Sequence, residues 1–434
     1  MKVSKKKVRY LVFEGGGGKG LIYLGVVKAL GETGVLEYIT KQISGNEVYR
    51  LNPKKIRGVA GTSVGSLAAT LIASGYTPDE LHHILTQDFG MYVLDKIDYG
   101  TIPTVSTKEN PGYIVKNQPI PEDRETLDNY WRNYIKTDKR SFKRIMRLPG
   151  KAFTHLNRKF FVSLMKWWLD YKERQIAKNS SESELDDFDS IFKMETTKTA
   201  FEKVLESPDT MNSLKYDLGL FLSEFIREFI DSQIEKKSGI KNCTFQQFYN
   251  EFGIDLVITG FNITRNEILY FRNEGIWRDL SVADAVRMSV SIPLIFKPVF
   301  FCYDDSKIYP IPENVDLKKC DLMVDGGVGN NFPLHVFDES RSRSSRLNNQ
   351  VLGFRLKRTR NECYDEELTL AQFIEKIGFS LLGQTTELQI RTDEEKDQVI
   401  ELEHEGINTL DFLYSEKTQR YIDMAYDTTM EYFE

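Results

Sequence analysis

The sequence predicts an α/β fold, in which helices cover the faces of a β-sheet. Residues 8–13 are mostly β-branched or aromatic, glycines follow between positions 15 and 20, and residues 21–30 have the apolar pattern of a buried helix. The same order of strand, glycine turn and helix recurs over residues 56–75. Two such units at the start of a chain are typical of a sheet with helices on its faces.

The remaining chain divides by composition. Residues 101–245 are rich in charge and aromatics and have few strand-like runs, which predicts a large helical insertion. Residues 361–434 are expected to be mainly helical. We therefore predict a main domain over residues 8–360, interrupted by the insertion at 101–245, and a C-terminal helical region at 361–434. Four more strand patterns lie at 255–262, 267–271, 322–327 and 351–356.

Composition limits the classes of protein and ligand. A chain of 434 residues with 41% hydrophobic content can bury a large core. The net charge of −6 indicates no nucleic-acid partner. The four cysteines form no close pair, and the five histidines form no ligand-spaced cluster with them. Neither a metal site nor a disulfide framework is therefore expected, and no cofactor is predicted.

The N-terminal segment does not resemble a cleavable signal peptide. The lysines of residues 2–7 are followed by an apolar run of only four residues, 10–13, before Glu14 and the glycines. Elsewhere no apolar run reaches the ~18 residues of a membrane span. The expectation is a soluble, cytoplasmic protein, with secretion by a signal-independent route left open.

Ser63 lies in a motif of the form G-x-S-x-G, at Gly61-Thr62-Ser63-Val64-Gly65. In this motif a nucleophile occupies a tight strand-to-helix turn, and the flanking glycines permit close backbone approach. The Val64 N–H at the start of the helix can then stabilise an oxyanion. A plain glycine turn at the end of a strand is the alternative interpretation.

The glycine loop at positions 15–20 has two possible roles. Its uncovered N–H groups in front of a helix can stabilise developing negative charge, with Lys19 adding positive charge. Alternatively, Gly15-x-Gly17-x-x-Gly20 fits a dinucleotide-binding fingerprint. That fingerprint requires an acid at the end of the second strand, and this strand ends at Ser63 instead.

Three motifs follow one another along the chain: the Gly15–Gly20 loop, the 61–65 pentad and Asp325-Gly326-Gly327. In this order they resemble the signature of the patatin-like phospholipases. Residues 281–298, with a helix pattern and a proline-containing turn, resemble the block that this family places ahead of its aspartate. The resemblance covers residues 8 to about 100 and 253–360. Two departures are Glu14, where the family usually has another residue, and the long 101–245 segment.

The resemblance implies a three-layer fold with a mainly parallel central sheet and a lipid acyl hydrolase of phospholipase A type. In this family Asp325 would activate Ser63 without a histidine, and the reaction would pass through an acyl-serine. Backbone groups of Gly15, Gly16 and Gly17, together with Val64, would form the oxyanion hole. The supporting motif residues are Gly18, Lys19, Gly20, Gly61, Gly65, Gly326 and Gly327. The implied partner is a phospholipid membrane surface, and a protein activator remains open.

Asp325 has two alternatives to this role. An aspartate before two glycines often shapes a turn through its own backbone contacts. A Ser-Asp-His hydrolase would need a histidine after the acid, for which His335 and His404 are the candidates. Asp325 ends an apolar strand pattern, where a sheet delivers residues to a site, and this favours the role of base.

Aromatic and basic residues alternate at helical spacing within the insertion. One interpretation is a helix that packs on the core with solvated charges. The other is an interfacial helix that contacts anionic lipid through Lys159, Lys166, Trp167 and Trp168. A non-catalytic lipid-binding or partner-binding module is thus a further alternative to the enzyme.

Overall fold

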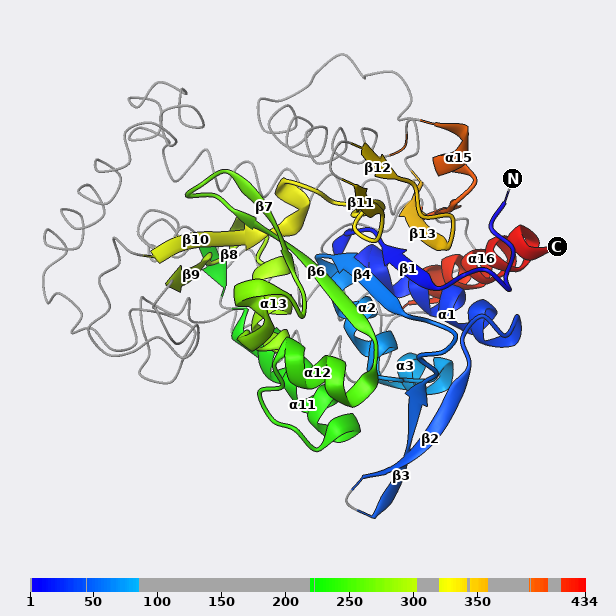
Figure 1. Ribbon diagram of the computed structural model, residues 1–434, viewed down its shortest axis with the longest axis horizontal. Helices are drawn as coiled ribbons and strands as arrows, with labels where there is room; N and C mark the ends of the chain where they lie inside the picture. Colours follow the sequence, from blue (N-terminus) through cyan, green and yellow to red (C-terminus); the bar gives the residue numbers. More distant parts are fainter. Residues whose placement is uncertain are drawn as a thin grey trace, which may run out of the picture.

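The computed structural model describes residues 2–43, 45–85, 219–221, 223–302, 320–341, 344–357, 390, 392–404 and 415–434. An eight-stranded sheet forms the centre of this part of the chain, in the order β14-β13-β1-β4-β6-β10-β9, with β7 also paired to β6 (Figure 1). The first five strands in this order run parallel, whereas β7, β9 and β10 are antiparallel to their neighbours. The predicted mainly parallel α/β fold is therefore confirmed.

The strands of the central sheet are β1 Tyr10–Phe13, β4 Gly58–Thr62, β6 Asp255–Asn262, β7 Glu267–Phe271, β9 Val299–Cys302, β10 Cys320–Asp325, β13 Val351–Leu356 and β14 Val399–Leu402. Among the described residues, three strand pairs lie outside it: β2 Tyr38–Ile43 with β3 Asn46–Leu51, β5 Gly219–Phe221 with β8 Leu294–Phe296, and β11 Glu339–Arg341 with β12 Ser344–Arg346. The β2–β3 hairpin projects from the body of the molecule (Figure 1).

The α-helices are α1 Tyr23–Glu32, α2 Val64–Ala73, α3 Pro78–His83, α11 Glu224–Ser238, α12 Phe245–Phe252, α13 Val282–Ser289, α15 Asp393–Lys396 and α16 Glu416–Phe433. Short 3₁₀ helices are η1 Gly17–Ile22, η5 Gly275–Asp279 and η7 Gly326–Val328. Helix α1 packs against α16, α2 packs on β4 and β1, and α11 packs on α13 and α2. These helices bury their apolar side chains in one continuous core with one face of the sheet.

Alternate residues of each central strand face opposite sides of the sheet. Leu11 and Phe13 of β1 belong to the large helical core. Val12, between them, belongs to a smaller cluster on the other face, with Phe332, Leu334 and Phe337. Apolar side chains therefore pack against both faces of the sheet, which explains why β1, β4 and β13 are buried along almost their whole length.

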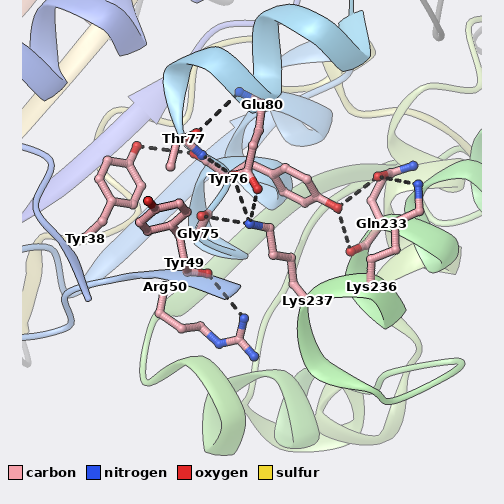
Figure 2. A network of polar contacts seen from close by, with 10 residues as sticks. All are labelled: Tyr38, Tyr49, Arg50, Gly75, Tyr76, Thr77, Glu80, Gln233, Lys236 and Lys237. Atoms are coloured by element: carbon pink, nitrogen blue, oxygen red, sulfur yellow. Dashed lines mark hydrogen bonds and ion pairs between the residues drawn. The ribbon is translucent and has the colours of Figure 1, made fainter. Parts of the chain in front are cut away.

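A buried polar network joins the β2–β3 hairpin, the turn after α2 and helix α11 (Figure 2). Lys237 of α11 is 3% exposed and donates to both carboxylate oxygens of Glu80, at 2.8 and 2.9 Å. Its ammonium also lies 4.5 Å from the centroid of the Tyr76 ring, and the Tyr76 hydroxyl donates to Gln233. Burial lowers the pKa of Lys237, and the contact with Glu80 partly offsets this effect.

The structure differs from the sequence analysis in the C-terminal region. Residues 361–434 were expected to be mainly helical, and α15 and α16 agree with this. Val399–Leu402, however, forms β14, which pairs in parallel with β13 at the end of the central sheet. The sheet therefore extends beyond the predicted domain limit at residue 360.

Most of the predicted insertion, residues 101–218, lies outside the described residues. The C-terminal part of the insertion, which the structure describes, contains helix α11, as predicted, and also the strand β5. Because α11 packs on α13 and α2, this part belongs to the core.

The expectation for the cysteines was wrong at one position. Cys320 is disulfide-bonded. It lies on β10 opposite Cys302 of β9, an adjacency that strand pairing creates and that spacing along the chain does not reveal.

Candidate active site

Ser63 lies between the end of β4 and the start of α2. Its backbone has φ of 52° and ψ of −129°, which residues other than glycine rarely adopt. A Cβ on Gly65 would lie 2.5 Å from the carbonyl oxygen of Phe13, and one on Gly61 would overlap the Gly65 carbonyl. The G-x-S-x-G motif is therefore a strained strand-to-helix turn that requires both glycines.

Asp325 reaches Ser63 from the end of β10. Thr62, the last residue of β4, pairs with Thr259 of β6, and Asp325 pairs with the next residue, Gly260. Strand β7 occupies the other side of β6, so β4 and β10 meet end to end along the same side. The aspartate thus arrives on an antiparallel strand that runs toward the serine, and not on a parallel neighbour.

The two side chains are in direct contact. Ser63 Oγ donates to Asp325 Oδ2 at 2.7 Å, and the Gly327 N–H donates to Oδ1 at 2.7 Å. Asp325 is 5% exposed, and burial raises the pKa of its carboxyl to about 7, although the hydrogen bonds from Ser63 and Gly327 lower it. A carboxyl group with this pKa can accept a proton near neutral pH.

The glycine loop lies against this pair. A Cβ on Gly15 would lie 3.0 Å from the Cβ of Ser63. The Gly15 N–H, however, donates to the carbonyl of Asn331 at 3.0 Å. The Gly15 N–H is therefore already paired, and its predicted role as an oxyanion donor would require this hydrogen bond to break. Among the residues that the structure describes, the Gly16 and Gly17 N–H groups have no recorded acceptor, so these two remain candidates with Val64.

Glu14 and Asn331 anchor the glycine loop. Glu14 Oε2 accepts from the Leu356 N–H at 2.6 Å, and Oε1 accepts from Asn331 Nδ2 at 3.2 Å. Asn331 Nδ2 also donates to the Gly15 carbonyl at 3.0 Å. The buried Glu14 therefore ties the loop to β13 and to the segment after Asp325. This explains why an acid is accommodated immediately before the glycines.

An apolar pocket opens beside the glycine loop and the first turns of α2. The lining residues are Gly17, Gly18, Gly20, Leu21, Val64, Leu67, Ala68 and Leu85. Because this lining includes Gly17 and Val64, the pocket adjoins the candidate oxyanion donors.

The histidine alternatives lie elsewhere. The ring Nδ1 of His335 is 2.8 Å from Asp338 Oδ2, and its Nε2 is 3.5 Å from Glu395 Oε1. Burial and, to a lesser extent, the positive charge of Lys19 lower the pKa of His404 to about 4. Neither histidine is among the recorded partners of Asp325, which are Ser63 and Gly327 for the side chain.

Three further expectations concern ligands and membranes. Within the part of the chain that the structure describes, no cluster of three or more His, Cys, Asp or Glu residues could hold a metal ion. In the same part, no helix combines the length and apolar character needed to cross a bilayer. The predicted lipid-contacting residues Lys159, Lys166, Trp167 and Trp168 lie outside the described residues.

Sequence reasoning missed two residues of the site. Asn331 contacts the glycine loop, and the hydroxyl of Ser289 accepts from the Ser63 N–H at 2.9 Å. The only indication in the sequence that Asn331 belongs to the site was its position six residues after Asp325. Ser289 stood in the block before the proline turn, but nothing in the sequence showed which hydroxyl there faces Ser63.

An α/β sheet that presents a strained serine in contact with a buried aspartate defines a class of proteins with a nucleophile elbow. Within this class, the chain belongs to the patatin-like phospholipase family, whose model matches residues 11–338.

Individual relatives match shorter parts of the chain. A protein of Invertebrate iridescent virus 6 named "Probable lipid hydrolase 463L" is 29% identical over 149 residues, which are 34% of this chain and 44% of that protein. The uncharacterized protein YqhO of Bacillus subtilis is 34% identical over 85 residues, covering 20% of this chain and 23% of the relative. The chain therefore matches less than half the length of each. The structure of VipD from Legionella pneumophila aligns with 98% of this chain and 67% of its own, at 16% identity and a TM-score of 0.41.

Proposed function

We propose that this chain is an acyl hydrolase of phospholipase A type, which cleaves acyl esters of membrane phospholipids through Ser63 and Asp325. The observation that carries the proposal is the 2.7 Å hydrogen bond from Ser63 Oγ to a buried carboxylate whose pKa is about 7. A base with this pKa is largely ionised just above neutral pH and can take the serine proton during attack.

The reaction follows from these groups. Ser63 Oγ attacks the ester carbonyl carbon while Asp325 Oδ2 accepts the hydroxyl proton, which gives a tetrahedral oxyanion. Its collapse breaks the bond to the alcohol oxygen, and Asp325 returns the proton to that leaving group. A water molecule then attacks the acyl-serine, with Asp325 again accepting and returning a proton, and the fatty acid is released.

The oxyanion would be stabilised by the N–H groups of Gly16, Gly17 and Val64. Val64 begins α2, so its N–H points from a helix N-terminus, where the helix dipole favours negative charge. Gly16 and Gly17 lie at the start of η1, and Gly17 has φ of 58°, a conformation that glycine adopts without strain.

Two findings support lipid as the substrate class. The surface beside Gly17 and Val64 is lined by apolar side chains and glycines, which favours contact with an acyl chain over contact with a polar substituent. The family to which the chain belongs is named for phospholipases, and the viral relative is named as a probable lipid hydrolase.

Access to a membrane is the remaining part of the proposal. We assign it to the 101–245 segment, whose Lys159, Lys166, Trp167 and Trp168 suit an anionic lipid surface. In this view residues 8–360 form the catalytic domain, and the protein acts as a peripheral membrane enzyme.

Covalent labelling with a fluorophosphonate probe tests the dyad. Ser63→Ala should abolish labelling and Asp325→Ala should strongly reduce it. Ser74→Ala is a matched control, because the Ser74 hydroxyl donates to the Thr70 carbonyl at the far end of α2, away from Ser63. Labelling that persists in Ser63→Ala would refute the assignment.

Release of fatty acid from phospholipid vesicles tests the substrate. Vesicles with a distinct acyl chain at each glycerol position would report both hydrolysis and the position cleaved. The alternative function, a non-catalytic lipid-binding or partner-binding module, predicts vesicle binding without labelling or turnover.

A further inference from the structure

One short stretch at the end of α13, Ser289–Ser291, contacts the backbone of both Ser63 and Asp325. The Ser63 N–H donates to Ser289 Oγ at 2.9 Å, and the Asp325 N–H donates to the Ser291 carbonyl at 2.9 Å. Ser289 and Ser291 are fully buried. A single turn therefore contacts the nucleophile and the base through groups that do not themselves react.

This turn is held rigidly by its own contacts. Ser291 Oγ donates to the Arg287 carbonyl at 2.7 Å and lies 3.2 Å from Ser223 Oγ. Arg287 Nε also donates to Ser223 Oγ, at 3.3 Å. Immediately after the turn, β8 pairs with β5. The position of Ser289 is thus fixed by two separate elements, α13 and the segment that leads into α11.

The contact with Ser289 matters because Ser63 is strained. Its φ is positive and its N–H donates to a hydroxyl of α13, and a buried N–H that loses its acceptor is strongly disfavoured. Without the Ser289 hydroxyl, the turn could relax toward ordinary backbone angles. Such a change would move Ser63 Oγ away from Asp325 Oδ2.

We propose that Ser289 is a positioning residue of the dyad, whose hydroxyl holds the Ser63 backbone in the conformation that directs Oγ at Asp325. The inference deepens the proposed function and rests on it, because it assumes that Ser63 is the nucleophile. It makes no use of Ser289 as a proton donor or acceptor toward substrate.

The test compares three variants of the full chain. Ser289→Ala removes the acceptor, and Ser289→Thr keeps a hydroxyl. Ser281→Ala is the matched control, since Ser281 is a buried serine at the opposite end of α13 whose hydroxyl makes no hydrogen bond within the described residues. The readouts are the maximal rate of fluorophosphonate labelling, the probe concentration at half-maximal rate, and the urea midpoint of unfolding.

We expect Ser289→Ala to lower the maximal labelling rate by about tenfold to a hundredfold, as small misplacements of reacting groups do. The half-saturating concentration should change by less than about twofold, because probe binding does not involve Ser289. Ser289→Thr should recover most of the rate, and Ser281→Ala should label like wild type. Amide exchange of the Ser63 peptide, measured by mass spectrometry, should be faster in Ser289→Ala alone.

An unchanged labelling rate in a folded Ser289→Ala variant would overturn the inference while leaving the proposed function intact. An equal loss of rate in Ser281→Ala would also overturn it, because the effect would then be general to α13. Absence of labelling in the wild-type protein would instead overturn the proposed function, and the positioning role with it. Unchanged amide exchange in Ser289→Ala would show that the hydroxyl does not hold the Ser63 N–H.

Discussion

The buried carboxyl group of Asp325 should make the wild-type protein less stable at neutral pH than an Asp325→Asn variant. Burial raises the pKa of this group from 3.8 to about 7. In the unfolded chain the group ionises near pH 4, whereas in the folded protein it stays protonated up to about pH 7. The unfolded state therefore binds fewer protons across this range, and the free energy of unfolding falls as pH rises.

The magnitude follows from the shift. A difference of about three pKa units, at 1.36 kcal/mol per unit, corresponds to a loss of about 4 kcal/mol by pH 8. Asparagine keeps the local hydrogen bonds, since its oxygen can accept from the Gly327 N–H and its amide can donate to Ser63 Oγ. Asp325→Asn should thus match wild type near pH 4 and exceed it by about 4 kcal/mol at pH 8.

Urea unfolding followed by circular dichroism at pH 4, 6 and 8 measures this difference. Asp321→Asn, in the same strand, is the matched control of opposite sign. Its carboxylate accepts from Asn262 and Arg265, so the substitution should lower stability at neutral pH. A stability gain in Asp325→Asn that does not vary with pH, or a loss at pH 8, would refute the reasoning.

Three further results are expected. The rate of fluorophosphonate labelling should rise with pH to a plateau, with a midpoint near 7, because the carboxyl group of Asp325 must be ionised to accept the serine proton. Labelling rates between pH 5 and 9 measure this midpoint, and a rate that does not change with pH would contradict the prediction. Glu80→Gln should lower the free energy of unfolding by about 2 kcal/mol, because the buried Lys237 loses its charged partner. The control is Lys396→Ala, which removes an exposed ion pair and should leave the urea midpoint of unfolding unchanged. Asn331→Ala should lower fatty-acid release from vesicles by about fivefold, since Gly15 loses an anchor worth about 1 kcal/mol. Unchanged turnover would show that the glycine loop needs no such anchor.

Strands that lie inside the core were predictable from local composition. The structure gives β6, β7 and β13 the bounds that the sequence analysis predicted. The apolar runs of β6 and β13 are buried in the sheet, whereas β7 is buried only at Phe271 and was predicted from its β-branched and aromatic residues. Strand β14 was missed for the opposite reason. Its four residues, Val399–Leu402, lie among charged residues and are a strand because β13 offers a free edge to pair with.

Contacts between distant segments explain the other differences. The bond from Ser63 to Ser289 joins residues 226 positions apart, and the bond from Asn331 to Gly15 joins residues 316 positions apart. The resemblance to the patatin-like family, carried by the order of three motifs, is what paired Ser63 with Asp325 and placed Gly15 in the oxyanion hole. The bond from the Gly15 N–H to the Asn331 carbonyl cannot be predicted from sequence.

The proposed reactivity of this site and its predicted cost in stability have the same structural origin. Because β4 and β10 meet end to end along β6, Ser63 and Asp325 face each other inside the protein and not at an open edge. The resulting burial raises the pKa of Asp325 into the range of a useful base, and the same burial makes its ionisation unfavourable. The strained backbone of Ser63 adds a second unfavourable contribution. Both must be offset by the surrounding contacts, so variants that abolish the chemistry while keeping those contacts should be more stable than the wild-type protein.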